Sequence, residues 1–385
     1  MTNFSSDLEK DPLIGEYVTE SVSKWREGID EEDSCLGDTL SVYSRLLRYK
    51  YLFIVACVAI IIVSAALSIT RGSYNIDFLK VYSLIWDHIW GTVAPEDHTA
   101  DYVVWDLRLP RILVAIFGGA ALAVAGAVMQ SVLKNPLADS YTTGVSSGAG
   151  FGAAVATLLI TSAGATIYGE SIMVTFAFVF SLIPMFIIIT VSKASNSSAT
   201  TMIMAGIGTM YIFSALTTVV KLLMSPDALT SMYSWQVGTL SLSSWKAVPV
   251  VTVITIACVV LSCILSQRLN VMATGDENAK ALGIDPDLHR TIFLIISGIL
   301  AAGIVSFVGL IGFVGLVAPH VCRIFIGADN RYLIPSSALF GATLMLVADQ
   351  IGQSLATQMP VGVIMAFFGG PAFILLIMRK SRSAW

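Results

Sequence analysis

The chain has 385 residues, of which 56% are hydrophobic and 12% are charged. Soluble domains carry roughly 25% charged residues, so this composition argues against an ordinary soluble domain and indicates a membrane protein. The charge is also uneven, because residues 1–44 hold eleven acidic and three basic side chains while the whole chain has a net charge of −4. We therefore predict an acidic cytoplasmic tail over residues 1–50 and a transmembrane domain over residues 51–385.

Apolar segments follow one another along the second region, which predicts an all-α polytopic protein with about ten transmembrane helices. The expected spans are 51–69, 108–133, 143–160, 171–192, 200–223, 246–266, 291–307, 312–325, 332–353 and 360–378. Between the first two spans, the tryptophan-bearing stretch Ile76–Trp90 is amphipathic and is expected to lie on the membrane surface. Residues 225–245 are expected to form an external connection that contains a short helix.

The distribution of basic residues orients these spans. Outside residues 1–44, thirteen Lys and Arg fall on the side assigned to the cytoplasm and six on the opposite side. Cytoplasmic loops carry an excess of Lys and Arg, so both termini are predicted to be cytoplasmic. The tail begins with acidic residues and lacks an apolar run, so it does not read as a signal peptide.

The second span is rich in glycine and alanine, including Gly118, Gly119 and Gly126. Small side chains allow helices to approach closely inside a membrane, so this helix is predicted to pack at the centre of the bundle. A polar break at Asn135 and Pro136 follows it and is expected to turn the chain at the cytoplasmic face.

Two arginines, Arg108 and Arg111, lie at the outer end of the same span and three residues apart, which places them on one helix face. One interpretation is anchoring at the membrane interface through long side chains that reach water. The other is a docking pair for carboxylates of an external partner, because guanidinium groups bind carboxylates bidentately.

The sequence contains no recognisable motif for catalysis or for nucleotide binding. No GxxxxGK[ST] phosphate loop occurs, so the chain is not expected to bind ATP in that mode, and no metal or cofactor site is predicted. Asp349 is the main ionisable group within the spans. That scarcity counts against an ion-coupled carrier, which commonly needs carboxylates or histidines within the membrane, although backbone carbonyls of broken helices also bind cations.

The polar loop 275–285 reads GDENAKALGID and predicts a short helix between Gly275 and Gly283, with Ala279 and Leu282 on one side. It is either a solvated loop or a cytoplasmic contact helix. A transporter without its own nucleotide site needs such a contact to receive force from a partner.

Taken together, eight motifs in order along the chain resemble the FecCD family, the permease subunits of binding-protein-dependent ABC importers for iron–siderophores, haem and cobalamin. The resemblance covers about residues 50–380. The motifs are RLPR at 108–111, GAALAVAGAVMQ at 119–130, NPLAD at 135–139, GVSSGAG at 144–150, WQVGTL at 235–240, GDENAKALGID at 275–285, IGFVGLVAPHVCR at 311–323 and PVGVIMAFFGGPAF at 360–373.

The resemblance implies a type II ABC importer permease with ten spans that pairs into a dimer, homomeric or heteromeric, around a central pathway. It further implies two ATPase subunits inside and a substrate-binding protein outside, and no nucleic acid partner. ATP hydrolysis is then expected in a partner chain, so this chain is a transporter subunit of the cytoplasmic membrane and not an enzyme.

The same resemblance assigns roles by position. It implies docking of the binding protein by Arg108 and Arg111. Coupling to the ATPase falls on Gly275, Asp276, Ala279, Leu282 and Gly283, and a cytoplasmic gate on Ser198, Thr200 and Thr201. The remaining motif positions, expected to be structural, are Asn135, Pro136, Gly312, Gly315, Pro319 and His320.

Two features depart from the family pattern. Gln353 stands where some relatives carry a further docking arginine, and the acidic tail is longer than usual. The sequence thus predicts import of a ferric-siderophore-type chelate, or of haem or cobalamin, with an ion-coupled secondary transporter with inverted repeats as the alternative.

Overall fold

The computed structural model describes residues 48–70, 74, 76–163, 169–194, 199–355 and 358–380. The chain forms two units, Met1–Phe53 and Ile54–Trp385. Residues 1–47, and with them nearly all of the predicted acidic tail, lie outside the described part of the chain.

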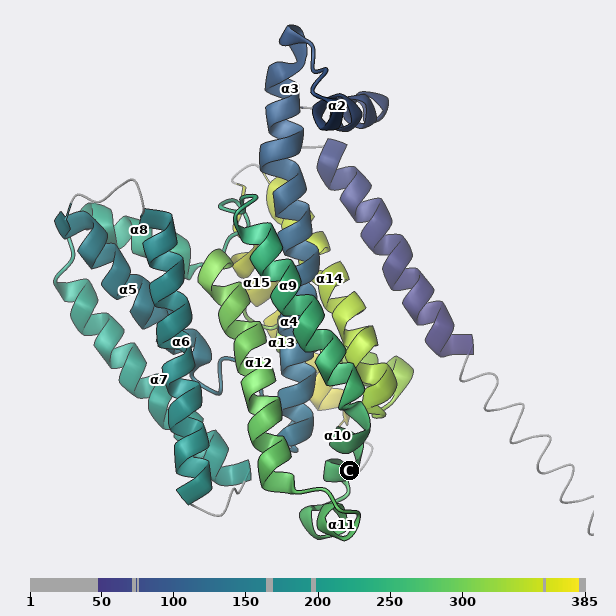
Figure 1. Cartoon of the computed structure of the whole chain (residues 1–385), viewed down its shortest axis with the longest axis vertical. Coiled ribbons are helices and arrows are strands. Elements are labelled where there is room, and N and C mark those ends of the chain that lie inside the picture. Colours follow the sequence, from purple (N-terminus) through teal and green to yellow (C-terminus); the bar gives the residue numbers. More distant parts are fainter. Residues whose placement is uncertain are drawn as a thin grey trace, which may run out of the picture. The chain divides into compact units, whose positions relative to one another are not determined.

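The described residues are mostly helical and contain no strand (Figure 1). After the first helix, Arg48–Thr70, the outer segment contains α2 (Phe78–Trp90), η1 (Pro95–Asp97), α3 (His98–Tyr102) and the π-helix η2 (Val103–Arg108). The remaining helices are α4 (Leu109–Val132), α5 (Val145–Ala163), α6 (Gly169–Ala194), α7 (Ala199–Leu222), α8 (Pro226–Gln236), α9 (Ala247–Ile264), α10 (Ser266–Ala273), α11 (Asp276–Ala281), α12 (Pro286–Val308), α13 (Val314–Ile326), α14 (Asn330–Ser354) and α15 (Val361–Lys380).

The prediction of about ten spans is confirmed. Eight helices of the described residues are long and apolar enough to cross a membrane, and two shorter apolar helices, Val314–Ile326 and Val361–Leu375, occupy the positions of the eighth and tenth predicted spans. The second span differs at its start, because η1, α3 and η2 continue directly into α4 as one helical run, Pro95–Val132. The short external helix expected within 225–245 is α8.

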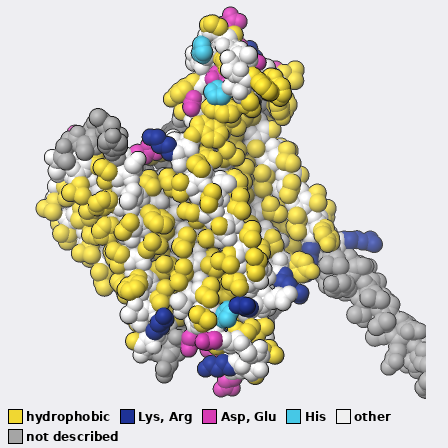
Figure 2. Space-filling view, viewed as in Figure 1, with side chains coloured by type: hydrophobic (Ala, Val, Ile, Leu, Met, Phe, Trp, Pro, Cys, Tyr) yellow, Lys and Arg dark blue, Asp and Glu magenta, His cyan; other side chains and the backbone are white. Residues whose placement is uncertain are grey.

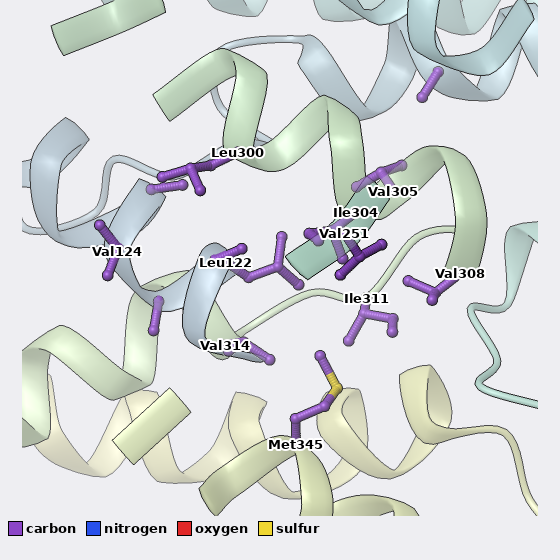
Figure 3. Close-up of a cluster of buried hydrophobic side chains, with 14 of the residues drawn as sticks. Leu122, Val124, Val251, Leu300, Ile304, Val305, Val308, Ile311, Val314 and Met345 are labelled. Atoms are coloured by element: carbon purple, nitrogen blue, oxygen red, sulfur yellow. The ribbon is translucent and has the colours of Figure 1, made fainter. Parts of the chain in front are cut away.

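Helix α4 lies at the centre of one helix group, where it contacts α9, α12, α13 and α14, as Figure 1 shows. A second group consists of α5, α6 and α7, and α12 packs against α5 and α6 to join the two groups. The first group encloses a core in which aliphatic side chains from five helices point toward one another (Figure 3). Leu122, Ile304 and Met345, from α4, α12 and α14, are 3% exposed or less.

Two glycines of α4 explain why the small-residue helix takes the central place. A Cβ added at Gly119 would lie 2.3 Å from the carbonyl oxygen of Gly341 in α14, and one at Gly126 would lie 1.9 Å from that of Gly315 in α13. Backbones that approach so closely gain van der Waals contact, which drives helix association where lipid removes the hydrophobic effect. The predicted packing role of this stretch is thus visible in atomic contacts.

The outer surface matches a protein that lies in a bilayer. Figure 2 shows hydrophobic side chains over the middle of the face in view, with Lys, Arg, Asp and Glu gathered mainly above and below them. In α6, α7 and α9 most of the apolar length faces outward, since 22%, 17% and 28% of their hydrophobic windows are buried. Exposed apolar area on this scale fits lipid as the surrounding medium.

Helix α2 presents an exposed apolar face, as expected for a helix on the membrane surface. Trp86 and Trp90 are each 64% exposed and Leu79 is 76% exposed, while Leu84 on the opposite face is buried. We expect that replacing Trp86 and Trp90 together with phenylalanine will remove a large part of the tryptophan fluorescence that brominated lipids quench. The control is Trp235→Phe, because Trp235 is 2% exposed; equal loss in both variants would contradict an interfacial α2.

Candidate translocation site

The segment between α4 and α5 turns back into the protein. Lys134, just past α4, adopts a left-handed conformation (φ of 48°), and its Nζ lies 3.6 Å from Asp276 Oδ1 near the cytoplasmic end. Five residues later, the Asp139 side chain lies beside Gly315, which packs against Gly126. Gly126 precedes the end of α4 at Val132 by six residues, a rise of about 9 Å. The polar break predicted at the cytoplasmic face therefore re-enters the bundle.

Local side-chain hydrogen bonds hold this re-entrant segment. Asn135 Oδ1 accepts from the backbone amide of Leu137 at 2.9 Å, and Asp139 Oδ1 accepts from the amides of Tyr141 and Thr142, both at 3.0 Å. Short polar side chains favour turns through such bonds. Pro136 adds a fixed φ that resists continuation of α4.

A second segment, residues 309–313, enters from the opposite side. It follows α12, and α13 then begins at Val314 at the depth of Leu122 and Gly126 of α4. Phe313 has a φ of 67°, a costly conformation for a non-glycine residue, and its side chain contacts Gly369 of α15. The predicted glycine-broken eighth span is thus a short helix, α13, that is preceded by the non-helical segment 309–313.

Backbone contacts brace the outer part of this second segment. The amide of Thr239 donates to Val308 O at 2.8 Å, and the amide of Gly362 donates to Gly238 O at 3.0 Å. A Cβ at Gly309 would lie 2.0 Å from the carbonyl oxygen of Trp235, and its φ of 76° also favours glycine. The segments WQVGTL (235–240) and PVGV (360–363) are therefore hydrogen-bonded to each other, and WQVGTL also contacts the end of α12.

Two adjoining cavities lie where the re-entrant segments meet. The larger, of about 560 Å³, is lined by the α4–α5 segment, the α12–α13 segment and α15. The smaller, of about 200 Å³, lies between α5 and α7. Tyr141, Gln236 and Leu310 line both cavities. Non-helical backbone at membrane depth is tolerated where it is buried in protein or lines a cavity, and broken helices commonly form transport sites.

The predicted docking arginines have partners within the chain. Arg111 binds Asp349 through two nitrogens, Nε at 2.9 Å and Nη2 at 2.8 Å, and Gln353 Nε2 donates to the same carboxylate at 2.7 Å. Arg108 is 9% exposed and donates to the backbone carbonyls of Ile69, at 2.6 Å, and of Tyr74. Gln353, the position that departs from the family pattern, thus helps to hold the carboxylate of Asp349.

The predicted coupling loop forms α11 between Gly275 and Gly283, both with positive φ. Asp276 accepts two hydrogen bonds from Arg290 Nη2 in α12, at 2.5 and 2.6 Å, and these bonds hold the pKa of its carboxyl below the usual value. The two apolar residues predicted to lie on one side of this helix differ in burial. Ala279 is buried inside the turn, whereas Leu282 follows the helix and is 67% exposed.

The predicted gate lies at the start of α7, where Thr200 is exposed and Thr201 is half-buried. Ser198 lies outside the described residues. In α13, Pro319 and His320 are buried, and the ring of His320 contacts Phe373 edge to face at 6.4 Å between centroids. Gly312 lies near the Tyr141 ring, so most of the predicted structural motif gathers around the re-entrant segments.

Three features of the site escaped sequence reasoning: the depth of Asp139, the Arg111–Asp349 pair, and the contribution of Ser146 and Lys221 to the smaller cavity. The spacing of Ser214, Thr217, Thr218 and Lys221 was an available signal, because it places polar groups on one face of an apolar helix. Among the described residues, no group of three or more His, Cys, Asp or Glu is arranged to hold a metal ion.

Comparison with known proteins supplies the family. The model of the FecCD transport family matches residues 59–379. The hemin transport system permease protein HmuU of Yersinia pestis is 35% identical, with 80% of this chain and 91% of that protein covered. The Fe(3+)-citrate import system permease protein YfmE of Bacillus subtilis is 31% identical, with 88% and 98% covered.

A third relative and one solved structure extend the comparison. The cobalamin import system permease protein BtuC of Halobacterium salinarum is 35% identical, with 74% of this chain and 76% of that protein covered. A solved structure of a metal-chelate type ABC transporter in an inward-facing conformation has a TM-score of 0.73 and 29% identity, covering 85% of this chain and 98% of that one. The all-helical architecture is therefore shared along most of both chains.

Proposed function

Since the chain belongs to the FecCD transport family, the multi-pass membrane permeases of ABC importers, we propose that it carries a ferric-siderophore-type chelate, or haem or cobalamin, across the cytoplasmic membrane. The observation that supports this most is the cavity of about 560 Å³ between two re-entrant segments. In a dimer, two such cavities facing a common axis form a pathway wide enough for a bulky chelate.

Energy enters through partner chains in this proposal. A pair of ATPase subunits binds at α11, and a substrate-binding protein delivers the chelate on the outer side. Helix α11 is fastened to two helices at once, because Asp276 binds Arg290 of α12 and lies near Lys134 past the end of α4. Both helices lead toward the re-entrant segments, so a displacement of α11 reaches the cavity through ion pairs and rigid helices.

The overall function is tested by uptake of a radiolabelled ferric chelate into cells that lack this chain or carry it. Uptake should require the chain and its ATPase and should persist when the proton gradient is collapsed. Uptake that stops with the proton gradient, while ATP remains, would favour the alternative, an ion-coupled secondary transporter. The sparse carboxylates within the spans favour the first outcome.

The contact surface at α11 gives a separate prediction. Replacing Leu282 with aspartate should reduce coupled uptake at least tenfold, because an exposed apolar side chain at an interface loses its burial when it is charged. The melting temperature should stay unchanged, since Leu282 is 67% exposed. Leu282→Met conserves volume and is the matched control. Normal ATPase binding by the Leu282→Asp protein would show that α11 is only a solvated loop.

A further inference from the structure

The smaller cavity, between α5 and α7, is lined by polar side chains to which the proposed function gives no role. Six polar side chains that line it come from these two helices: Ser146, Ser147, Ser214, Thr217, Thr218 and Lys221. Lys221 is the single charged side chain among the lining residues that the structure describes. Lys221 lies in the last turn of α7, where a long side chain normally extends to the membrane interface, yet here it lines the cavity.

Lys221 is held in place by neutral partners. Its Nζ donates to Gln236 Oε1 at 2.5 Å and lies 4.5 Å from the centre of the Tyr233 ring. Neither partner cancels the charge, so the ammonium keeps its positive field toward the cavity. Because Gln236 uses its carbonyl oxygen for Lys221, its amide nitrogen is left to donate.

The inner end of the cavity also supplies donors. Ser146 lies in the first turn of α5, is 1% exposed, and its Oγ has no hydrogen-bond partner within the described residues. A buried hydroxyl that is left unpaired is destabilising, and such groups call for an explanation. A helix N-terminus adds a partial positive charge of about +0.5 at the same place.

The carboxylate of Asp139 is not among the groups that line this cavity. Asp139 lines the adjoining larger cavity and is 4% exposed, and its Oδ1 already accepts two backbone amides. The smaller cavity therefore combines one uncompensated cation, an unpaired hydroxyl and a helix N-terminus, all suited to acceptor oxygens.

We propose that this cavity is a subsite of the pathway for an anionic, oxygen-bearing group, so that the transported chelate is a net anion with free carboxylate-type oxygens. The inference rests on the proposed function and narrows it. A carboxylate ferric chelate or a propionate-bearing porphyrin fits. A neutral corrinoid, or a neutral or cationic ferric hydroxamate, does not fit.

The first test uses the full transporter, with its ATPases and its binding protein, in proteoliposomes. The probes are radiolabelled ferric citrate, haem, a neutral and a cationic ferric trihydroxamate, and cyanocobalamin. Accumulation limited to ferric citrate or haem is the expected result. Accumulation of a neutral or cationic probe at a comparable rate overturns the anion subsite and leaves import intact. Accumulation of none of the probes overturns the proposed import function together with it.

The second test asks whether the preference for anions depends on this cavity. It compares variants of Lys221 in the uptake of whichever anionic probe accumulates. Lys221→Gln should lower the uptake rate about tenfold, and Lys221→Arg should keep it within about twofold. The matched control is Lys246→Gln, which removes an exposed positive charge that does not line the cavity. Stimulation of ATP hydrolysis by the binding protein should be equal in all three variants. Unchanged uptake in Lys221→Gln overturns the proposal.

Ser146→Ala supplies a readout that separates ligand binding from folding. Removing an unpaired buried hydroxyl should leave the melting temperature unchanged or raise it, yet uptake of the anionic probe should fall severalfold. Uptake by Ser146→Ala at the rate of the unaltered protein would show that the Ser146 hydroxyl does not bind the anionic probe.

Discussion

Replacing Arg111 with alanine should destabilise the protein by about 3–5 kcal/mol, the usual cost of removing one partner from a buried ion pair. The side chain of Asp349 is 3% exposed and that of Arg111 is 21% exposed. Without the guanidinium, the hydrogen bond from Gln353 is the one that Asp349 retains among the residues that the structure describes. The measurement is the melting temperature of the purified protein in detergent, together with the yield of folded protein.

A paired substitution serves as the control. Removing both charges, as in Arg111→Leu with Asp349→Leu, should recover most of the lost stability, because apolar groups can replace a buried ion pair at little cost. A melting temperature unchanged in Arg111→Ala would contradict the structural role of the pair.

The same variants resolve the role proposed for Arg111 in docking. A charge reversal at Arg111 would disturb both Asp349 and any external partner, so its effect on transport would be ambiguous. The double leucine variant keeps the bundle intact while it removes the guanidinium. If it retains stimulation of ATP hydrolysis by the binding protein, Arg111 acts within the bundle; if it loses stimulation, Arg111 also contacts the partner.

Replacing Gly126 with alanine is the second change with a large expected effect. The added Cβ would lie 1.9 Å from Gly315 O, and 2.6 Å from its Cα, so α4 and α13 must move apart. Overpacking of this kind costs about 1–3 kcal/mol and occasionally more. Because Gly315 also contacts the Asp139 side chain, the separation should disturb the re-entrant segment and reduce uptake as well as the melting temperature.

The matched control for Gly126 is Gly208→Ala. Gly208 is helical in α7, and a Cβ there meets nothing within 4 Å, so the same chemical change should be neutral or slightly stabilising. Equal melting temperatures for Gly126→Ala and Gly208→Ala would show that the contact between α4 and α13 is more adaptable than its geometry implies.

The spans and the short helices were predictable from local signals. Long apolar runs with basic flanks predicted the membrane helices, and Gly275 and Gly283 bracketed α11 correctly. The difference in burial between Ala279 and Leu282 was not predictable, although the Leu282 amide still donates to Asn278 O at 3.1 Å as in a helix. Burial of a side chain on a short helix depends on what packs against it, and the local sequence does not show that.

The depth of the re-entrant segments was not predictable from one sequence. Asn135, Pro136 and Asp139 are typical of a turn, whether the turn lies in water or within the bundle. Likewise Arg111 and Asp349 are 238 residues apart, and no local pattern connects them. Such pairings depend on how helices pack, and packing is decided by contacts such as Gly126 with Gly315 and Gly119 with Gly341.

The continuous helical run Pro95–Val132 has a mechanical consequence. With 38 residues it extends over about 57 Å at 1.5 Å per residue, while the hydrocarbon core of a bilayer is about 30 Å thick. One helical run, which includes the π-helix η2, therefore joins the outer segment that carries Arg108 to the cytoplasmic end near Lys134 and α11. The outer side and the cytoplasmic side of the protein are thus connected through a single helical run with no intervening loop.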